Sequence, residues 1–326
     1  MDTAVALERW AMKDVFATSR DAIEEIPVIV VTLTDAAGHR GRAEAAGVDY
    51  DGETPQSMTS QITALAGRLS ERTTRIELSE LLPPGGARNA LDCAFWDLEA
   101  KRSQVRAWRS AGLDGLEPVT TCLTIGLGGE AETRRKARAA AGYELLKLKL
   151  DAERHIDLVR IVREEQPRAR LLVDANQAWS RSLLERLLPE LAALGVELVE
   201  QPVPREQDAT LDGLVSSLPL AADESCTDRS SLPRLVGRYQ YVNIKLDKCG
   251  GLTEALALAE QARRLRLGLM VGNMCGTSLA MAPAFLIAQS CRYVDLDGPL
   301  LQREDRAHAI VYRHGLMSVP QAELWG

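Results

Sequence analysis

The stretch Glu144-Leu145-Leu146-Lys147-Leu148-Lys149-Leu150 sets two charged side chains into a short apolar run. Successive side chains of a strand point to opposite faces, so Lys147 and Lys149 share one face and the alternating leucines share the other. Lysine is almost always exposed, and this stretch by itself fits an edge strand with two solvated side chains. The pattern in the rest of the chain favours a buried site instead.

From about residue 119, short strand-like runs alternate with helical patterns. The expected strands cover residues 120–127, 144–150, 170–174, 196–200, 219–223, 241–246, 268–272 and 292–296. This alternation predicts parallel βαβ units, and eight strands fit a (β/α) barrel. A doubly wound open sheet is the alternative. The even repeat and the lack of a Gly-x-Gly-x-x-Gly turn after the first strand favour the barrel.

A charged residue stands at or next to the C-terminal end of five consecutive expected strands. These residues are Lys149, Asp174, Glu200, Asp223 and Lys245. In a barrel these strand ends meet at one mouth, where active sites are built. One such charge would be explained as a helix cap, but five at the same position of the repeat predict a shared site.

The order of these charges indicates their chemistry. Asp174, Glu200 and Asp223 lie on adjacent strands, and three carboxylates suit a hard cation such as Mg²⁺, one per active site. No histidine stands at an expected strand end, which disfavours zinc and iron.

Lysines flank the carboxylates on both sides. A lysine acts as a base only after losing its proton, which a neighbouring ammonium group and a nearby metal promote. Lys147, two residues from Lys149 on the same face, is expected to supply that neighbouring charge. With Lys245 on the other side, the arrangement suits removal of a proton from a carbon next to a carboxylate, with Mg²⁺ stabilising the resulting enediolate.

Motifs around these residues resemble those of the enolase superfamily, in its muconate-lactonizing-enzyme subgroup, whose known sites pair such bases with Mg²⁺. The matching segments are Lys147-Leu148-Lys149, Asp174-Ala175-Asn176, Glu200-Gln201-Pro202, Asp223-Glu224-Ser225 and 243–251. The resemblance implies a modified (β/α)7β TIM barrel with an α+β capping domain. The capping domain would span residues 1–112, completed by the tail 302–326, and the barrel 113–301. The expected hairpin at 27–33 and 41–46 and the helices at 54–71 and 87–102 fit the capping domain.

Within this subgroup, the segment 294–300 resembles the dipeptide epimerases, among them the L-Ala-D/L-Glu epimerases. There, the Asp295 and Asp297 pair would bind the free α-ammonium group of the substrate, which two carboxylates suit. The same resemblance implies substrate contacts from Thr124, Arg20, Met274 and Cys275.

The resemblance therefore implies an isomerase that inverts the α-carbon of the C-terminal residue of an L,L-dipeptide by two-base 1,1-proton transfer. Lys149 and Lys245 are the two bases, and Lys147 also helps to neutralise the enediolate. The alternatives are an o-succinylbenzoate synthase, an N-acylamino acid racemase or a cycloisomerase with the same frame of residues. A non-catalytic barrel that binds a small molecule is a further alternative.

Composition excludes several other classes. The 326 residues carry a formal net charge of −7 and no basic block, which argues against a nucleic-acid partner. We expect no signal peptide and no membrane span. The six cysteines are scattered without a C-x-x-C pair, which fits a reducing cytoplasm and indicates neither a disulfide framework nor a zinc site. A homo-oligomer is compatible with this composition.

Overall fold

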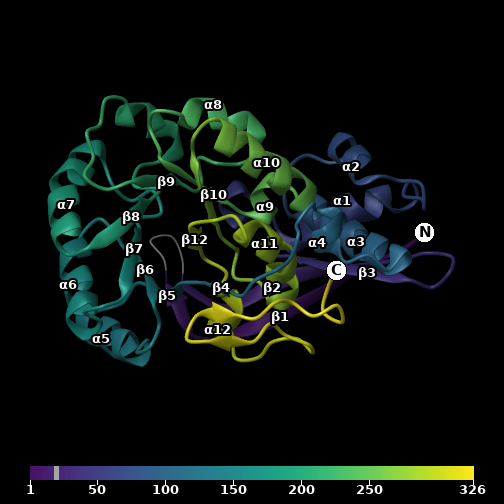
Figure 1. The fold of residues 1–326 in the computed structure, drawn as a ribbon, viewed down its shortest axis with the longest axis horizontal. Helices are drawn as coiled ribbons and strands as arrows, with labels where there is room; N and C mark the ends of the chain where they lie inside the picture. The colour runs from purple at the N-terminus through teal and green to yellow at the C-terminus, as the bar shows by residue number, and fades with distance from the viewer. Residues whose placement is uncertain (18–21) are drawn as a thin grey trace.

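The computed structural model describes residues 1–17 and 22–326, and it consists of a barrel and an adjoining smaller layer (Figure 1). Arg20, an expected substrate contact, lies outside the described residues. The barrel occupies one side of the molecule, and an antiparallel sheet with its helices occupies the other.

Eight parallel strands form the barrel, in the spatial order in which they follow one another along the chain. They are β5 (Leu123–Ile125), β6 (Leu145–Lys149), β7 (Arg170–Asp174), β8 (Val196–Glu200), β9 (Leu220–Ala222), β10 (Tyr241–Ile244), β11 (Gly268–Val271) and β12 (Tyr293–Val294). The first and last strands approach each other where Cys122 N–H donates to Val294 O at 2.9 Å. This bond joins the two edges of the sheet and closes the ring.

Helices cover the outer face of the barrel, as the alternation of strand and helix requires. They are α5 (Glu130–Ala139), α6 (His155–Glu165), α7 (Arg181–Ala193), α8 (Leu232–Leu235), α10 (Leu252–Arg264) and α11 (Ser278–Ala288), with 3₁₀ turns η2 (Arg205–Leu211) and η3 (Arg229–Ser231). Most of these outer helices bury one apolar stripe; in α6 it includes Ile156, Val159 and Val162. The short helices α9 (Leu246–Cys249) and α12 (Gly298–Leu301) instead contact α3 (Gly86–Ser103) and β1 (Asp2–Ala17) of the smaller layer, respectively. The last strand is followed only by the short α12, so the barrel has the (β/α)7β form.

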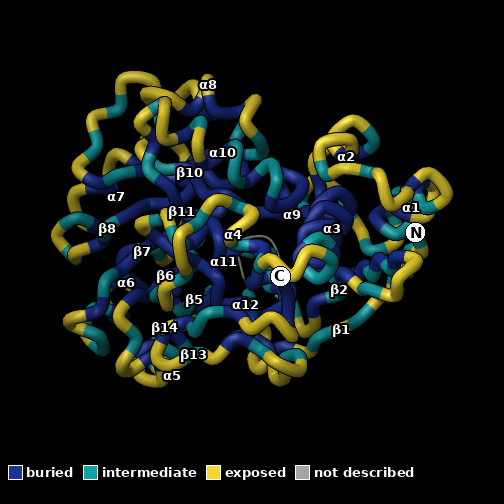
Figure 2. The backbone as a smooth tube through the Cα atoms, turned by 45° about the vertical axis from the view of Figure 1, so that its right-hand side comes forward, coloured by how far each residue is buried: buried dark blue, intermediate teal, exposed yellow. Residues whose placement is uncertain are grey.

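The smaller layer is a three-stranded antiparallel sheet packed on helices. Its elements are β1 (Asp2–Ala17), β2 (Ala22–Thr34), β3 (Arg40–Ala45), the 3₁₀ turn η1 (Asp49–Asp51), α1 (Pro55–Ala66), α2 (Arg75–Leu81), α3 (Gly86–Ser103) and α4 (Ala107–Ser110). Helix α3 is buried along almost its whole length, as the dark tube in Figure 2 shows. At Gly41 a Cβ would lie 2.2 Å from Ala94 O, so only glycine lets β3 pack this closely on α3.

The C-terminal tail returns to this smaller layer. It forms β13 (Tyr312–Arg313), which pairs with β14 (Leu316–Met317), and β14 in turn pairs with β4 (Val119–Thr120). Its end lies beside α3 and α4 (Figure 1), where Trp325 Nε1–H donates to Cys93 O at 3.0 Å. Gly326 N–H donates to Asp97 Oδ1 at 2.7 Å. The tail therefore completes the cap, and the expected architecture of a modified barrel with an α+β capping domain is confirmed.

The open-sheet alternative is wrong, because the eight strands curl until the first and last are joined. The expected strands 170–174 and 196–200 match the observed bounds, and the other expected strands are up to five residues longer than the observed ones. The sixteen-residue strand β1 was not expected. Long-range pairing with β2 holds this strand in place. One register runs from Asp2↔Thr34 to Ala11↔Glu25, and it shifts before Phe16↔Ile23. The domain boundaries at residues 112 and 301 stay a prediction.

Two further sequence expectations concern disulfides and membranes. All six cysteines fall within the described residues and are free. In the described ranges, 1–17 and 22–326, no helix combines the length and the apolar character needed to span a bilayer.

Candidate active site

The strand ends bring the predicted charges to one mouth of the barrel. Parallel pairing sets Lys149 opposite Asp174 and Asp174 opposite Glu200. Asp174, Glu200 and Asp223 are at most 1% exposed, and Lys245 is 7% exposed. Four of the five strand-end charges are therefore buried and the Lys149 side chain is only 11% exposed, which contradicts the prediction that Lys147 and Lys149 are solvated edge residues.

Asp174, Glu200 and Asp223 form a compact set of oxygen atoms. One carboxylate oxygen from each lies within 4.8 Å of the others. The side chain of Asn243 donates to Glu200 Oε1 at 2.8 Å, and Asn176 N–H donates to Asp174 Oδ1 at 2.9 Å. These bonds fix the direction of two of the carboxylates. A buried set of three carboxylates without nitrogen or sulfur ligands fits a hard divalent cation such as Mg²⁺.

Lys147 lies at the centre of the mouth. Its Nζ is 2.7 Å from Glu200 Oε2, 3.0 Å from Asp174 Oδ2 and 2.7 Å from Asp295 Oδ2. Burial acts to lower the pKa of Lys147, but the negative charges of Asp174, Asp295 and Glu200 outweigh it and raise that pKa well above its ordinary value. Lys147 is therefore a fixed positive charge.

The two lysines expected to act as bases contact opposite ends of the carboxylate set. Lys149 Nζ lies 2.6 Å from Asp174 Oδ2, the same oxygen that Lys147 contacts. Lys245 Nζ lies 2.8 Å from Asp223 Oδ2. Burial opposes the charged form of Lys245, yet the adjacent Asp223 carboxylate raises its pKa. A cation held by Asp223 would offset that effect.

The carboxylates respond unequally to this environment. Burial disfavours ionisation of Asp174, but the ammonium groups of Lys147 and Lys149 outweigh burial and lower its pKa below the usual range. Burial, together with the charge of Asp174, raises the pKa of Glu200 to about 8. A bound cation would favour the ionised form of Glu200.

Asp295 and Asp297 follow the last strand, β12, and both are buried. Asp295 contacts Lys147, whereas Asp297 Oδ2 accepts a hydrogen bond from Thr124 N–H at 2.6 Å. Burial and the neighbouring charge of Asp295 raise the pKa of Asp297 to about 7. A positive charge nearby would favour the ionised form of Asp297, so the pair suits a cationic group of a ligand.

The loop after β11 carries Met274 and Cys275 to the same mouth. Met274 Sδ lies 3.9 Å from Lys245 Nζ. Cys275 adopts a left-handed backbone with φ 60°, and Gln302 in the tail holds its carbonyl by a 2.6 Å hydrogen bond. Burial raises the pKa of the Cys275 thiol to about 12, so it stays protonated and is not a nucleophile.

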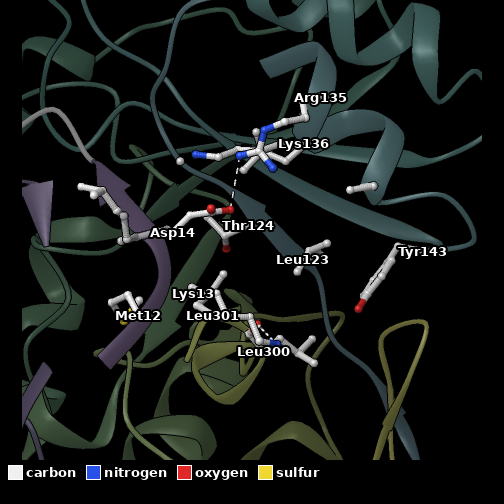
Figure 3. A pocket seen from close by; sticks show the side chains of 15 residues that line it. Met12, Lys13, Asp14, Leu123, Thr124, Arg135, Lys136, Tyr143, Leu300 and Leu301 are labelled. Atoms are coloured by element: carbon white, nitrogen blue, oxygen red, sulfur yellow. Dashed lines mark hydrogen bonds and ion pairs between the residues drawn. The ribbon is translucent and has the colours of Figure 1, made fainter. Parts of the chain in front are cut away.

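A separate cavity of about 310 Å³ lies between β1, β5, α5 and α12 (Figure 3). Thr124 and Tyr143 line it, and an ion pair between Asp14 and Arg135 stands at its edge. Among the predicted site residues that the structure describes, only Thr124 lines this cavity.

Sequence reasoning missed one charged residue of the site. Lys248 is 4% exposed, and its Nζ lies 2.6 Å from Asp223 Oδ1, so Asp223 is held between two lysines. Lys245 is the N-cap of α9 and Lys248 follows it by three residues within that helix. A spacing of three places two side chains on one face of a helical turn. That spacing was the available signal.

Comparison with known protein families matches both parts of the chain. Residues 1–109 match the mandelate racemase / muconate lactonizing enzyme N-terminal domain, and residues 130–323 match the enolase C-terminal domain-like family. An L-Ala-D/L-Glu epimerase of Escherichia coli (strain K12) is 40% identical over 310 residues, covering 94% of this chain and 96% of that protein. An N-acetyl-D-glutamate racemase of Pseudoalteromonas sp is 42% identical over 302 residues, covering 92% and 95%.

Solved structures give the same relationship. An enolase family member from Agrobacterium tumefaciens with homology to dipeptide epimerases, with bound sodium and L-Ala-L-Glu, has a TM-score of 0.97 and 40% identity. The match covers 99% of both chains. A dipeptide epimerase from Methylococcus capsulatus, complexed with Mg and the dipeptide L-Arg-D-Lys, has a TM-score of 0.91 and 31% identity, covering 98% of this chain and 97% of that one.

Proposed function

The chain belongs to the mandelate racemase / muconate lactonizing enzyme family of the enolase superfamily, and on that premise we propose that it is a Mg²⁺-dependent dipeptide epimerase. It inverts the α-carbon of the C-terminal residue of an L-Ala-L-Glu-like dipeptide by two-base proton transfer. The reaction is an isomerisation, since no atom is gained or lost.

The observation that carries this proposal is the placement of Lys149 and Lys245. They end the second and the sixth strands, which lie opposite each other in a ring of eight. Inversion needs a base on each face of the α-carbon. Lys149 removes the proton from one face and Lys245 delivers a proton to the other, and the roles exchange in the reverse direction.

Asp174, Glu200 and Asp223 are the residues that would hold the cation. When bound there, Mg²⁺ would supply a Lewis acid for the substrate carboxylate and so stabilise the charge that develops when the α-proton leaves. Lys149 and Lys245, which contact Asp174 and Asp223, would be less tightly paired with these carboxylates once they hold a cation. Lys147 keeps its positive charge beside the reacting centre and balances the negative charge that develops there.

Asp295 and Asp297 support a substrate with a free α-ammonium group. Asp295 is already paired with Lys147, so Asp297 is the carboxylate that most needs a cationic partner. Thr124 N–H donates a hydrogen bond to Asp297 and so orients its carboxylate. Met274 lies beside Lys245 on the loop that borders the substrate, and Arg20 is the candidate partner of a side-chain carboxylate.

An N-acylated glutamate is the second candidate substrate. It is favoured by the racemase at 42% identity, which acts on N-acetyl-D-glutamate. An N-acyl group has no positive charge, so Asp297 would meet it as the protonated acid, which its raised pKa permits in part at neutral pH. The dipeptide therefore requires Asp297 to be ionised, whereas the N-acylated substrate requires it to be protonated.

The experiment is an exchange assay in D₂O with MgCl₂. L-Ala-L-Glu and N-acetyl-L-glutamate are incubated separately, and single deuterium incorporation at the α-carbon is followed by mass spectrometry with chiral separation. We expect faster incorporation and inversion for the dipeptide. Faster turnover of N-acetyl-L-glutamate would select the second candidate, and no incorporation from either substrate would exclude proton transfer as the activity.

A further inference from the structure

Gln201 directly follows the candidate metal ligand Glu200 and is completely buried. Its backbone is left-handed, with φ 32°, which is unusual for a residue with a side chain. Its Oε1 accepts hydrogen bonds from Asp223 N–H at 2.9 Å and Ser225 N–H at 3.1 Å. Gln201 thus connects the backbone of one candidate ligand, Glu200, to the backbone of another, Asp223.

The amide nitrogen of Gln201 faces a second set of partners. Nε2 donates to Ser225 Oγ at 2.8 Å, to Tyr239 OH at 3.1 Å and to Val203 O at 2.9 Å. Both hydroxyl groups in turn donate to one oxygen of Asp208, Ser225 at 2.9 Å and Tyr239 at 2.6 Å. These contacts form a closed network beneath the carboxylate set.

Asp208 sets the direction of the two hydroxyl groups in this network, and the backbone groups Asp223 N–H, Ser225 N–H and Val203 O orient the Gln201 amide in the same sense. An ionised carboxylate only accepts hydrogen bonds, so both hydroxyl groups must give their hydrogen to Asp208. Their lone pairs then face Gln201, which must present its NH₂ group to them and its oxygen to Asp223 N–H. If the Gln201 amide were reversed, its oxygen would face hydroxyl oxygens and its NH₂ would face the two N–H groups.

Asp208 also costs stability where it lies. It is 4% exposed, and its Oδ2 has no hydrogen-bond partner among the described residues. A buried carboxylate oxygen without a partner is unfavourable. We propose that Asp208 is a positioning residue of the metal site, acting through Ser225, Tyr239 and Gln201 on the backbone of Asp223. The proposal rests on the proposed function only in requiring that the carboxylate set binds Mg²⁺.

The test is calorimetric titration of the metal-free protein with MgCl₂. The variant Asp208→Asn offers an amide that also donates hydrogen bonds, so the hydroxyl groups of Ser225 and Tyr239 lose their fixed direction while volume is kept. We expect the Kd for Mg²⁺ to rise about tenfold, in the range found when groups behind metal ligands are changed. The matched control is Asp212→Asn, which removes an exposed pair with Arg238 just after the same 3₁₀ segment and should leave the Kd unchanged.

Thermal unfolding of the same samples separates positioning from a purely structural role. A structural role would lower Tm without changing the Kd of the folded protein. If Asp208→Asn does not fold, Tyr239→Phe decides in its place, with an expected rise of about threefold, since one of the two oriented hydroxyl groups is lost. A wild-type Kd in the deciding variant, or an equal change in the control, overturns the proposal. Absence of Mg²⁺ binding by the wild-type protein would instead contradict the proposed function.

Discussion

Lys147 Nζ lies 2.7 Å from Asp295 Oδ2, inside a barrel whose second strand carries the lysine and whose eighth strand precedes the aspartate. The same nitrogen lies 2.7 Å from Glu200 on the fourth strand. Strands four and eight are opposite each other in the ring, so Lys147 spans the mouth. One ammonium group therefore links the carboxylates expected to hold a cation to those expected to hold the substrate.

Replacing Lys147 measures how much its positive charge stabilises the fold by neutralising the buried carboxylates of Asp174, Glu200 and Asp295. In metal-free Lys147→Met, Asp174, Glu200 and Asp295 lose a shared partner, and breaking a buried ion pair in this way costs about 3–5 kcal/mol. Urea unfolding in EDTA measures that loss, and MgCl₂ should recover part of it. The control, Lys136→Met, removes a partly exposed pair with Glu132 and should cost less than about 1 kcal/mol. Equal losses in the two variants would contradict the central role of Lys147.

Removing one base at a time separates the two faces of the reaction. Lys149→Ala and Lys245→Ala should each lower epimerisation by about 10²–10⁴-fold, the usual contribution of a positioned acid or base. Each variant should still exchange the α-proton of one epimer for deuterium without inverting it, because the other lysine remains. The measurement is deuterium incorporation into L-Ala-L-Glu and L-Ala-D-Glu, assayed separately. Near wild-type epimerisation by either variant would exclude two-base transfer.

The charge of the substrate amino group can be tested at Asp297. Asp297→Asn removes a charge-assisted contact worth about 1.5–3 kcal/mol, so KM for L-Ala-L-Glu should rise about tenfold or more. In the wild-type protein the pKa of about 7 means that Asp297 loses its negative charge as pH falls below 7. KM for the dipeptide should therefore rise between pH 7 and pH 6, whereas KM of the variant should not. A KM for N-acetyl-L-glutamate that rises in parallel would show that charge is not the cause.

The sequence predicts the barrel and the convergence of its charges because both follow from periodicity. The C-terminal strand ends of a barrel converge on one mouth, so Asp174, Glu200 and Asp223 lie close together independently of the loop conformations. Contacts between loops are different. The Gln201–Asp208 network and the pairing of Lys248 with Asp223 depend on where distant side chains meet, and no local pattern encodes that. Strand β1 was not predicted because its pairing with β2, and not a local sequence pattern, determines it.

Trp325 anchors the tail to the cap and is 2% exposed. Trp325→Ala should destabilise the protein by about 3–5 kcal/mol, because a large buried side chain is lost together with its hydrogen bond to Cys93 O. Equilibrium unfolding in urea measures this change. Val215 is 94% exposed, and Val215→Ala is expected to stay within about 0.5 kcal/mol of wild type. A similarly small effect at Trp325 would mean that the tail is dispensable for the cap.

Asp247 joins the cap to the barrel and makes their stability depend on pH. Its Oδ1 accepts a hydrogen bond from Gly47 N–H at 2.9 Å, and burial raises its pKa to about 7. An unfolded aspartate titrates near pH 4, so the native protein binds the proton more tightly. The stability that this proton contributes is complete below about pH 4 and is lost as pH rises through 7.

Asp247→Asn cannot lose a proton, and it keeps an oxygen for Gly47 N–H. Relative to wild type it should therefore gain about 2–3 kcal/mol between pH 5 and pH 8, since each pH unit below the native pKa is worth about 1.4 kcal/mol. Urea unfolding at intervals of half a pH unit follows this difference, and Asp114→Asn, at an exposed position, should give a curve parallel to wild type. A constant difference between Asp247→Asn and wild type across this range would show that Asp247 is ionised in the native protein throughout, and that the junction of cap and barrel carries a buried negative charge.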